Sequence, residues 1–156
     1  MTPTLPTCAN SVPTFALQID GGAYNGKYLY SIPFVNQGVN LATAGSTVIA
    51  ASAYTLTGTT LTEYTGYTLA TPAGTAFTYA EFRPATQLST NGGPDIPAVC
   101  AVANGQLTCA ESGATQAGIC NISGAVTVFT LLGCYPSGFG CTNVVLNVIP
   151  LCTVSR

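Results

Sequence analysis

The sequence predicts an all-β fold, an antiparallel sandwich or barrel stapled by disulfides. Short apolar runs alternate with polar residues at the two-residue period of strands, and glycines and prolines separate these runs. No long stretch combines a 3.6-residue period with good helix-forming residues. We expect an extended, proline-rich arm over residues 1–13 and a single β domain over residues 14–156.

The predicted domain begins with a hairpin. The run TFALQID from Thr14 alternates apolar and polar residues, and KYLYSIPFV from Lys27 alternates again after a glycine-rich turn. Residues 36–46 lack this alternation and are expected to form a loop. The two runs are therefore expected to form a hairpin.

Glycine and proline divide the middle of the chain. Short strands are expected on either side of Gly58 and Gly66, and a further strand between Gly74 and Pro84. Residues 85–97 contain too much glycine and proline to continue a sheet, so we expect a long surface loop there.

The stretch AVCAVANGQLTCA, residues 98–110, specifies a second hairpin and a disulfide. Asn104-Gly105 favours a two-residue type I′ turn, and counting outward from it places Cys100 opposite Cys109. This is a non-hydrogen-bonded pair, with Cα atoms roughly 4.5 Å apart, within reach of a disulfide. We expect the face that carries both cysteines, Val102 and Leu107 to be buried.

The two most β-branched runs, residues 125–132 and 142–149, are expected to form an antiparallel hairpin. In that arrangement Cys134 and Cys141 close its loop, while Cys120 and Cys152 lie near its open end. Nested pairing is the simplest solution, but six cysteines allow many connectivities, so only Cys100–Cys109 is a firm prediction. The residues expected to build the sheet that anchors the core are Val126, Val128, Phe129, Val144, Val145, Leu146 and Val148.

The cysteines also predict a compartment. Six of the seven lie between Cys100 and Cys152, which favours an oxidising, extracellular setting. Without histidine or closely spaced cysteines a metal site is not expected, and neither is a cofactor. Residues 1–14 lack the basic start and the apolar core of a signal peptide, so we expect either that a signal has been removed or that Met1 is not the natural first residue. No apolar run is long enough for a membrane helix.

Seven thiols cannot all pair within one chain, and Cys8 lies apart from the rest. We therefore expect Cys8 to be unpaired, either free or bridged to another chain. The extended arm around it suits addition to a sheet edge, so self-association is expected to run through this arm. A mobile leader is the competing interpretation.

The scarcity of charge excludes several functions. Charged residues make up 5% of the chain, and three basic side chains cannot follow a nucleic-acid backbone. Without histidine there is no Ser-His-Asp triad or Cys-His pair. Paired carboxylates remain, but we expect turn positions for Asp20 and Asp95 and an ion pair between Glu81 and Arg83. The remaining carboxylates, Glu63 and Glu111, lie in no catalytic motif, so no enzymatic activity is predicted.

Exposed aromatic rings flanked by amides or carboxylates are typical of sugar sites. The candidate glycan contacts are Tyr28, Tyr30, Tyr64 and Tyr67. Asn121 begins the single N-glycosylation sequon, which we expect on a surface loop.

Four stretches resemble secreted, disulfide-bonded β modules in cell-surface proteins of filamentous fungi: FALQIDGGAYNGKYLY, AYTLTGTTLTEYTGYTL, VCAVANGQLTC and GCTNVVLNVIPLC. The resemblance spans most of residues 12–152. It implies an extracellular location and carries no catalytic residue. We therefore expect a non-catalytic structural or cell-surface module that self-assembles into oligomers or fibres. The alternative is a carbohydrate-binding, lectin-like module whose partner is a cell-wall glycan.

Overall fold

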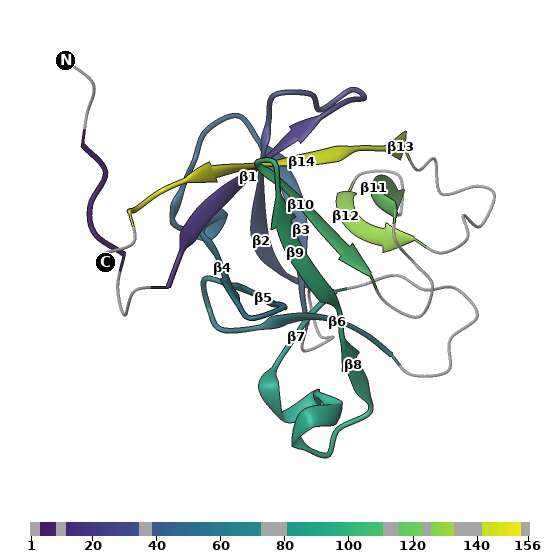
Figure 1. Ribbon diagram of the computed structural model, residues 1–156. Helices are drawn as coiled ribbons and strands as arrows, with labels where there is room; N and C mark the ends of the chain where they lie inside the picture. The colour runs from purple at the N-terminus through teal and green to yellow at the C-terminus, as the bar shows by residue number, and fades with distance from the viewer. Residues whose placement is uncertain are drawn as a thin grey trace.

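A computed structural model of the chain shows an antiparallel β-barrel with additional strands (Figure 1), so the predicted all-β class is confirmed. It describes residues 4–8, 12–34, 39–72, 81–110, 116–122, 126–132 and 142–153. Among these residues no helix is long and apolar enough to cross a membrane. The helices that the structure describes are three single 3-10 turns, η2 (Ala50–Ser52), η3 (Ala85–Gln87) and η4 (Ser89–Asn91).

Seven strands hydrogen-bond into a closed ring in the order β1, β2, β3, β7, β6, β5, β4 and back to β1. Every pair in the ring is antiparallel, and closure leaves no free edge within it. The bounds of these strands are β1 (Thr14–Asp20), β2 (Tyr28–Phe34), β3 (Val39–Gly45), β4 (Tyr54–Thr57), β5 (Thr60–Glu63), β6 (Thr68–Pro72) and β7 (Glu81–Arg83).

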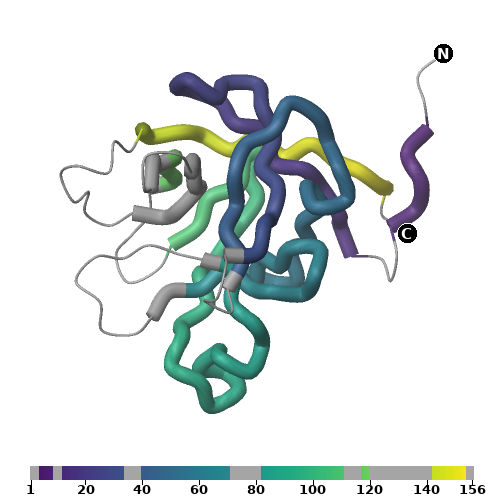
Figure 2. Tube along the Cα trace, turned by 180° about the vertical axis from the view of Figure 1, so that it is seen from behind, coloured from purple at the N-terminus to yellow at the C-terminus, as the bar shows by residue number. Residues whose placement is uncertain are grey.

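The additional strands branch from three members of the ring (Figures 1 and 2). β14 pairs with β1, and the hairpin of β9 and β10 continues the sheet from β14. β12, β11 and β13 extend in that order from β3, and β8 pairs with β6. Their bounds are β8 (Asp95–Pro97), β9 (Val99–Ala103), β10 (Gln106–Ala110), β11 (Gln116–Ile122), β12 (Val126–Leu132), β13 (Thr142–Asn143) and β14 (Val145–Pro150).

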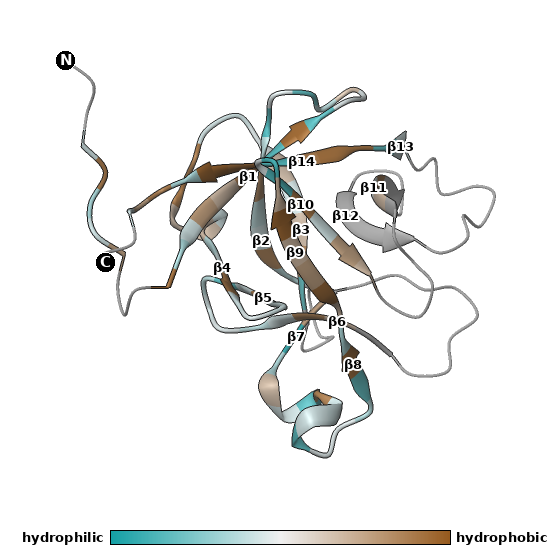
Figure 3. Ribbon diagram, viewed as in Figure 1, coloured by the Kyte–Doolittle hydropathy of each residue, from teal (hydrophilic) through white to brown (hydrophobic). Residues whose placement is uncertain are grey.

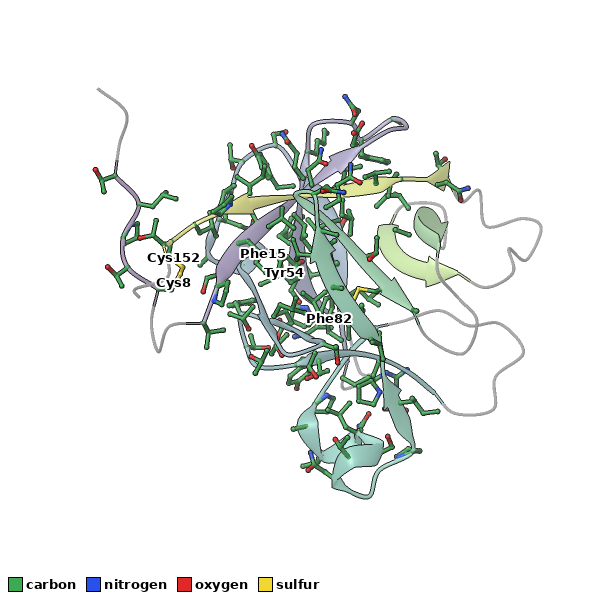
Figure 4. All side chains as sticks on the ribbon, in the orientation of Figure 1. Cys8, Phe15, Tyr54, Phe82 and Cys152 are labelled. Atoms are coloured by element: carbon green, nitrogen blue, oxygen red, sulfur yellow. A yellow bond between two sulfur atoms is a disulfide. The ribbon has the colours of Figure 1, made fainter. Side chains whose placement is uncertain are left out.

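The core fills the ring and continues beneath the branch formed by β14, β10 and β9. On β1 the inward positions Phe15, Leu17 and Ile19 are buried, as the alternation of TFALQID requires. Tyr54 and Phe82 meet across the barrel, with ring centroids 5.7 Å apart (Figure 4). Apolar residues run along β9 and β14 (Figure 3), and some of them, such as Val99 and Val145, are exposed. The branch shares its inward face with the ring because Cys100, Leu107 and Leu146 belong to the same buried cluster as the ring residues.

The local turns agree with the sequence predictions. Gly58 and Gly66 have positive φ angles of 61° and 95°, and each separates two strands of the ring. Asn104 and Gly105, at φ 54° and 74°, form the predicted hairpin turn.

The predicted register of the 98–110 hairpin is also confirmed. Cys100 lies opposite Cys109, and a disulfide joins them across a Cα separation of 4.0 Å. Leu107 is buried on the same face, but Val102 is 42% exposed. The expectation of burial is therefore wrong for Val102, because it lies on β9, the last strand of this branch, whereas Leu107 lies on β10 between β9 and β14.

Two predicted loops contain strands instead. Residues 39–45 form strand β3 rather than part of a loop, and β3 pairs along its whole length with β2. The alternation was obscured because the polar Asn40 occupies a buried position. Residues 95–97, expected in a surface loop, form β8 on β6.

The expected hairpin between the two β-branched runs does not form. β12 pairs with β11 and β3, whereas β14 pairs with β1 and β10. The partner of β14 is β1 because their registers match Leu17 with Val148 and Ile19 with Leu146 on the core side. Val145, Leu146 and Val148 lie in β14 as expected, although the Val145 side chain is 41% exposed. Val144 is buried but lies between β13 and β14. The side chains of Val126, Val128 and Phe129 lie outside the described residues.

Cys8 is not unpaired, because it forms a disulfide with Cys152 of the same chain (Figure 4). Antiparallel pairing of β1 and β14 brings the segment before β1 to the segment after β14, and Thr7 forms a parallel bridge with Thr153 there. The Cα atoms of the two cysteines are 4.9 Å apart. The same bond rules out the suggested pairing of Cys120 with Cys152, while Cys134, Cys141 and the side chain of Cys120 lie outside the described residues.

Candidate functional site

The structure divides the four candidate glycan tyrosines between two places. Tyr28 and Tyr30 lie on the outward face of β2, because the alternating residues Leu29 and Ser31 are buried inside the ring. Tyr64 and Tyr67 belong to the turn between β5 and β6.

The two places lie toward opposite ends of β3. Thr65, in the β5–β6 turn, accepts a hydrogen bond from the Asn40 amide near the start of β3, whereas Tyr28 pairs with Gly45 at its end. Five residues of strand separate these positions, roughly 17 Å. Tyr28 and Tyr30 can therefore share a surface, whereas Tyr64 and Tyr67 belong to another one.

The sheet register places three side-chain amides in line with Tyr28. Gln106 of β10 lies opposite Asn147 of β14, Asn147 opposite Gln18 of β1, and Gln18 opposite Tyr28 of β2. Directly opposite residues point to the same face, here the outward one. Gln106 is exposed and the other three are half-buried. We call these four residues the amide–tyrosine row.

A glycine lets a second ring lie beside this row. Gly45 lies opposite Tyr28, and a Cβ atom at Gly45 would approach Cε1 of Tyr30 to 3.0 Å and its Cδ1 to 3.2 Å. The Tyr30 ring therefore lies over the space that a side chain at position 45 would occupy. Two aromatic rings thus border the β2 end of the row.

The row carries no charge, and its amide side chains make few hydrogen bonds within the described structure. The Gln18 Nε2 atom donates a hydrogen bond to the Gly26 carbonyl oxygen at 3.2 Å, which leaves its own carbonyl oxygen available. The side chains of Gln106 and Asn147 make no hydrogen bond to any residue that the structure describes. Lys27, next to Tyr28 in the chain, places Nζ 5.6 Å from the ring centroid of Tyr24.

Glu63 is a buried carboxylate that organises the β5–β6 turn. It accepts hydrogen bonds from the backbone N–H groups of Thr65 (2.9 Å) and Tyr67 (2.8 Å), from the Thr65 hydroxyl, and from the Asn40 amide (3.2 Å). Glu63 is 3% exposed. Its oxygens are thus occupied by the local fold, which explains why an acidic residue is tolerated in the barrel wall.

Asp95 is a buried ion-pair partner rather than an exposed turn residue. Nη1 of Arg83 lies 3.6 Å from Oδ2 of Asp95, and the two side chains are 16% and 4% exposed. Arg83 lies on β7 and Asp95 on β8, and both of these strands pair with β6. The structure thus pairs Arg83 with Asp95, whereas Glu81 was expected as its partner. The side chain of Glu81 and all of Glu111 lie outside the described residues.

Asn121 lies in strand β11, opposite Thr127 of β12, rather than in the expected loop. Its side chain lies outside the described residues. Across the described part of the chain, no three His, Cys, Asp or Glu side chains gather in a group that could hold a metal ion.

Sequence reasoning identified Tyr28 and Tyr30 but missed Gln18, Asn147 and Gln106. Each amide sits at an outward position of an alternating run, where a polar residue is ordinary. Only the pairing of β10, β14 and β1 aligns them, and these strands are far apart in the sequence. Comparisons with protein-family models, curated proteins and solved structures find no match to this chain.

Proposed function

We propose that this protein is a non-catalytic structural module of an extracellular surface, which packs against copies of itself and other surface components. The observation that carries this proposal is that most of the few charged side chains described are buried or paired. Glu63 and Asp95 are buried and Arg83 is paired, which leaves Asp20 and Lys27 as the charged groups on the described surface. Such a surface offers little electrostatic repulsion to a neighbour.

The two disulfides support the compartment in this proposal. Cystines persist in oxidising surroundings, and this chain closes one between its two ends and one inside its core. The N-terminal arm, residues 1–13, is not the proposed site of self-association. Because Cys8 is bonded within the chain, the proposed packing uses the barrel surface and requires no covalent link through Cys8.

Sedimentation velocity tests the proposal. The full, oxidised chain is measured over a wide range of concentrations, at low and at high salt. We expect larger species to grow with concentration and to persist at high salt, because few charges contribute to the contacts. A monomer at every concentration, or assembly that salt abolishes, would contradict the proposal.

Incubation with a panel of polysaccharides tests the non-catalytic part. No release of reducing ends is expected. Hydrolysis that disappears when a single carboxylate is replaced by its amide would contradict it.

A further inference from the structure

We propose that the amide–tyrosine row binds an extended, neutral polysaccharide that lies across strands β10, β14, β1 and β2. This inference goes beyond the structural role proposed above and does not depend on it. It rests on three features of the row: its linear geometry, its lack of charge and the chemistry of its side chains.

The geometry suits a chain-like ligand. The row crosses four neighbouring strands at right angles to them, and each step between strands is about 4.8 Å. Gln106, Asn147, Gln18 and Tyr28 therefore span about 14 Å in nearly equal steps. Such a repeat places one polar group under each successive sugar unit of an extended chain.

The side chains suit hydroxyl-rich sugars. Each amide has both donor and acceptor atoms, so it can meet a sugar hydroxyl in either role. Tyr28 adds an aromatic face for the apolar side of a sugar ring and a polar hydroxyl at its tip. Tyr30 lies over Gly45 next to Tyr28 and extends this platform onto β3.

The absence of charged side chains in the row favours a neutral glycan over an acidic one. No Lys or Arg belongs to the row, and Lys27 lies against the Tyr24 ring. Asp20, two residues beyond Gln18 on β1, points to the same outward face and would repel an acidic chain. A neutral polysaccharide therefore fits this surface, whereas a uronic-acid or sulfated chain would find no cationic partner.

Affinity electrophoresis of the full, oxidised chain tests the site. The protein migrates through gels that contain a soluble linear β-glucan, a mannan or, as the charged control, polygalacturonate. We expect retardation by a neutral polysaccharide and none by polygalacturonate. Gln106→Ala and Asn147→Ala should each weaken binding about five- to tenfold, and Tyr28→Ala at least as much, because each removes one contact.

Matched variants separate binding from folding. Tyr64 is 50% exposed in the β5–β6 turn, away from the row, so Tyr64→Ala should leave retardation unchanged. Gln106 is exposed beside a hairpin turn, so Gln106→Ala should keep the melting temperature of the wild type. Gly45→Ala would push the Tyr30 ring aside and should weaken binding less than Tyr28→Ala does.

Several results would overturn the proposal. These are failure of every neutral polysaccharide to retard the protein, equal retardation of wild type and Gln106→Ala, or equal loss of binding in Tyr64→Ala. If Gln106→Ala instead abolishes self-association in the absence of glycan, the row is an interface between copies and the glycan proposal is wrong.

Discussion

Tyr54 places a buried polar group in the interior of the barrel. Its side chain is fully buried against Phe82, and its hydroxyl has no hydrogen-bond partner among the described residues. Burial, followed by the negative charge of Glu63, raises the pKa of this hydroxyl far above its ordinary value. The folded protein therefore keeps the Tyr54 proton under conditions in which an unfolded chain releases it.

Tyr54→Phe should increase the free energy of unfolding at neutral pH by about 1 kcal/mol, because it removes a buried polar group that has no partner. The sign of the pH dependence follows from the raised pKa. The stability is fully present below pH 10, the ordinary value for tyrosine, and the wild type loses it as the pH rises further. The loss should be about 1.4 kcal/mol per pH unit greater in the wild type than in Tyr54→Phe.

Urea denaturation between neutral pH and pH 11 measures this difference, with Tyr64→Phe as the control for an exposed ring. If the free energy of unfolding falls equally steeply above pH 10 in the wild type and in Tyr54→Phe, the Tyr54 hydroxyl titrates alike in the folded and unfolded states, and the prediction is wrong.

At the scale of elements, the segment from η3 to β8 depends on one close approach of the backbone. A Cβ atom at Gly93 would lie 2.3 Å from both the carbonyl carbon and the oxygen of Gln87. The backbone N–H of Gly93 also donates to the Leu88 carbonyl oxygen at 2.9 Å. Only glycine allows this contact, and it positions β8 for pairing with β6.

Gly93→Ala should lower the free energy of unfolding by about 3 kcal/mol, since the chain must move away from Gln87. The matched control is Gly26→Ala. Gly26 has a left-handed backbone, with φ 86°, but open space around it. Gly26→Ala should therefore lower the free energy of unfolding by only about 1 kcal/mol, the cost of a left-handed alanine. Thermal unfolding of both variants measures the difference, and equal destabilisation would argue against the steric explanation.

At the scale of the whole molecule, the two disulfides close loops of very different length. Cys100 and Cys109 are 9 residues apart in sequence, and Cys8 and Cys152 are 144 apart. In the chain-entropy description, a disulfide stabilises by restricting the unfolded chain, more so for a longer loop. The bond between the chain ends should therefore contribute more than the bond inside the core hairpin.

Replacing Cys8 and Cys152 with Ser should lower the free energy of unfolding by about 5 kcal/mol while leaving the circular dichroism of the folded state unchanged. The entropic loss for the Cys100 and Cys109 pair should be only about 3 kcal/mol. Denaturation of both double variants measures the contributions. Peptide mapping of the oxidised wild type is the control, and a peptide that joins Cys8 to any cysteine other than Cys152 would contradict this assignment.

The features that the sequence determined by itself are local. The Asn104-Gly105 turn, the register of β9 with β10 and the bond between Cys100 and Cys109 all follow from about a dozen consecutive residues. The glycine turns between β4, β5 and β6 are equally local. These features could be predicted because a short turn leaves its two strands a single favourable register.

Only the tertiary structure decided which distant strands became neighbours. β14 pairs with β1 rather than β12, because inward residues of β14 and β1 must be buried against the same core. That one pairing also brings Cys8 to Cys152 and aligns Asn147 with Gln18. Alternation shows which face of a strand is buried, but closure of the ring selects its partner. The terminal disulfide and the amide–tyrosine row are both consequences of that selection.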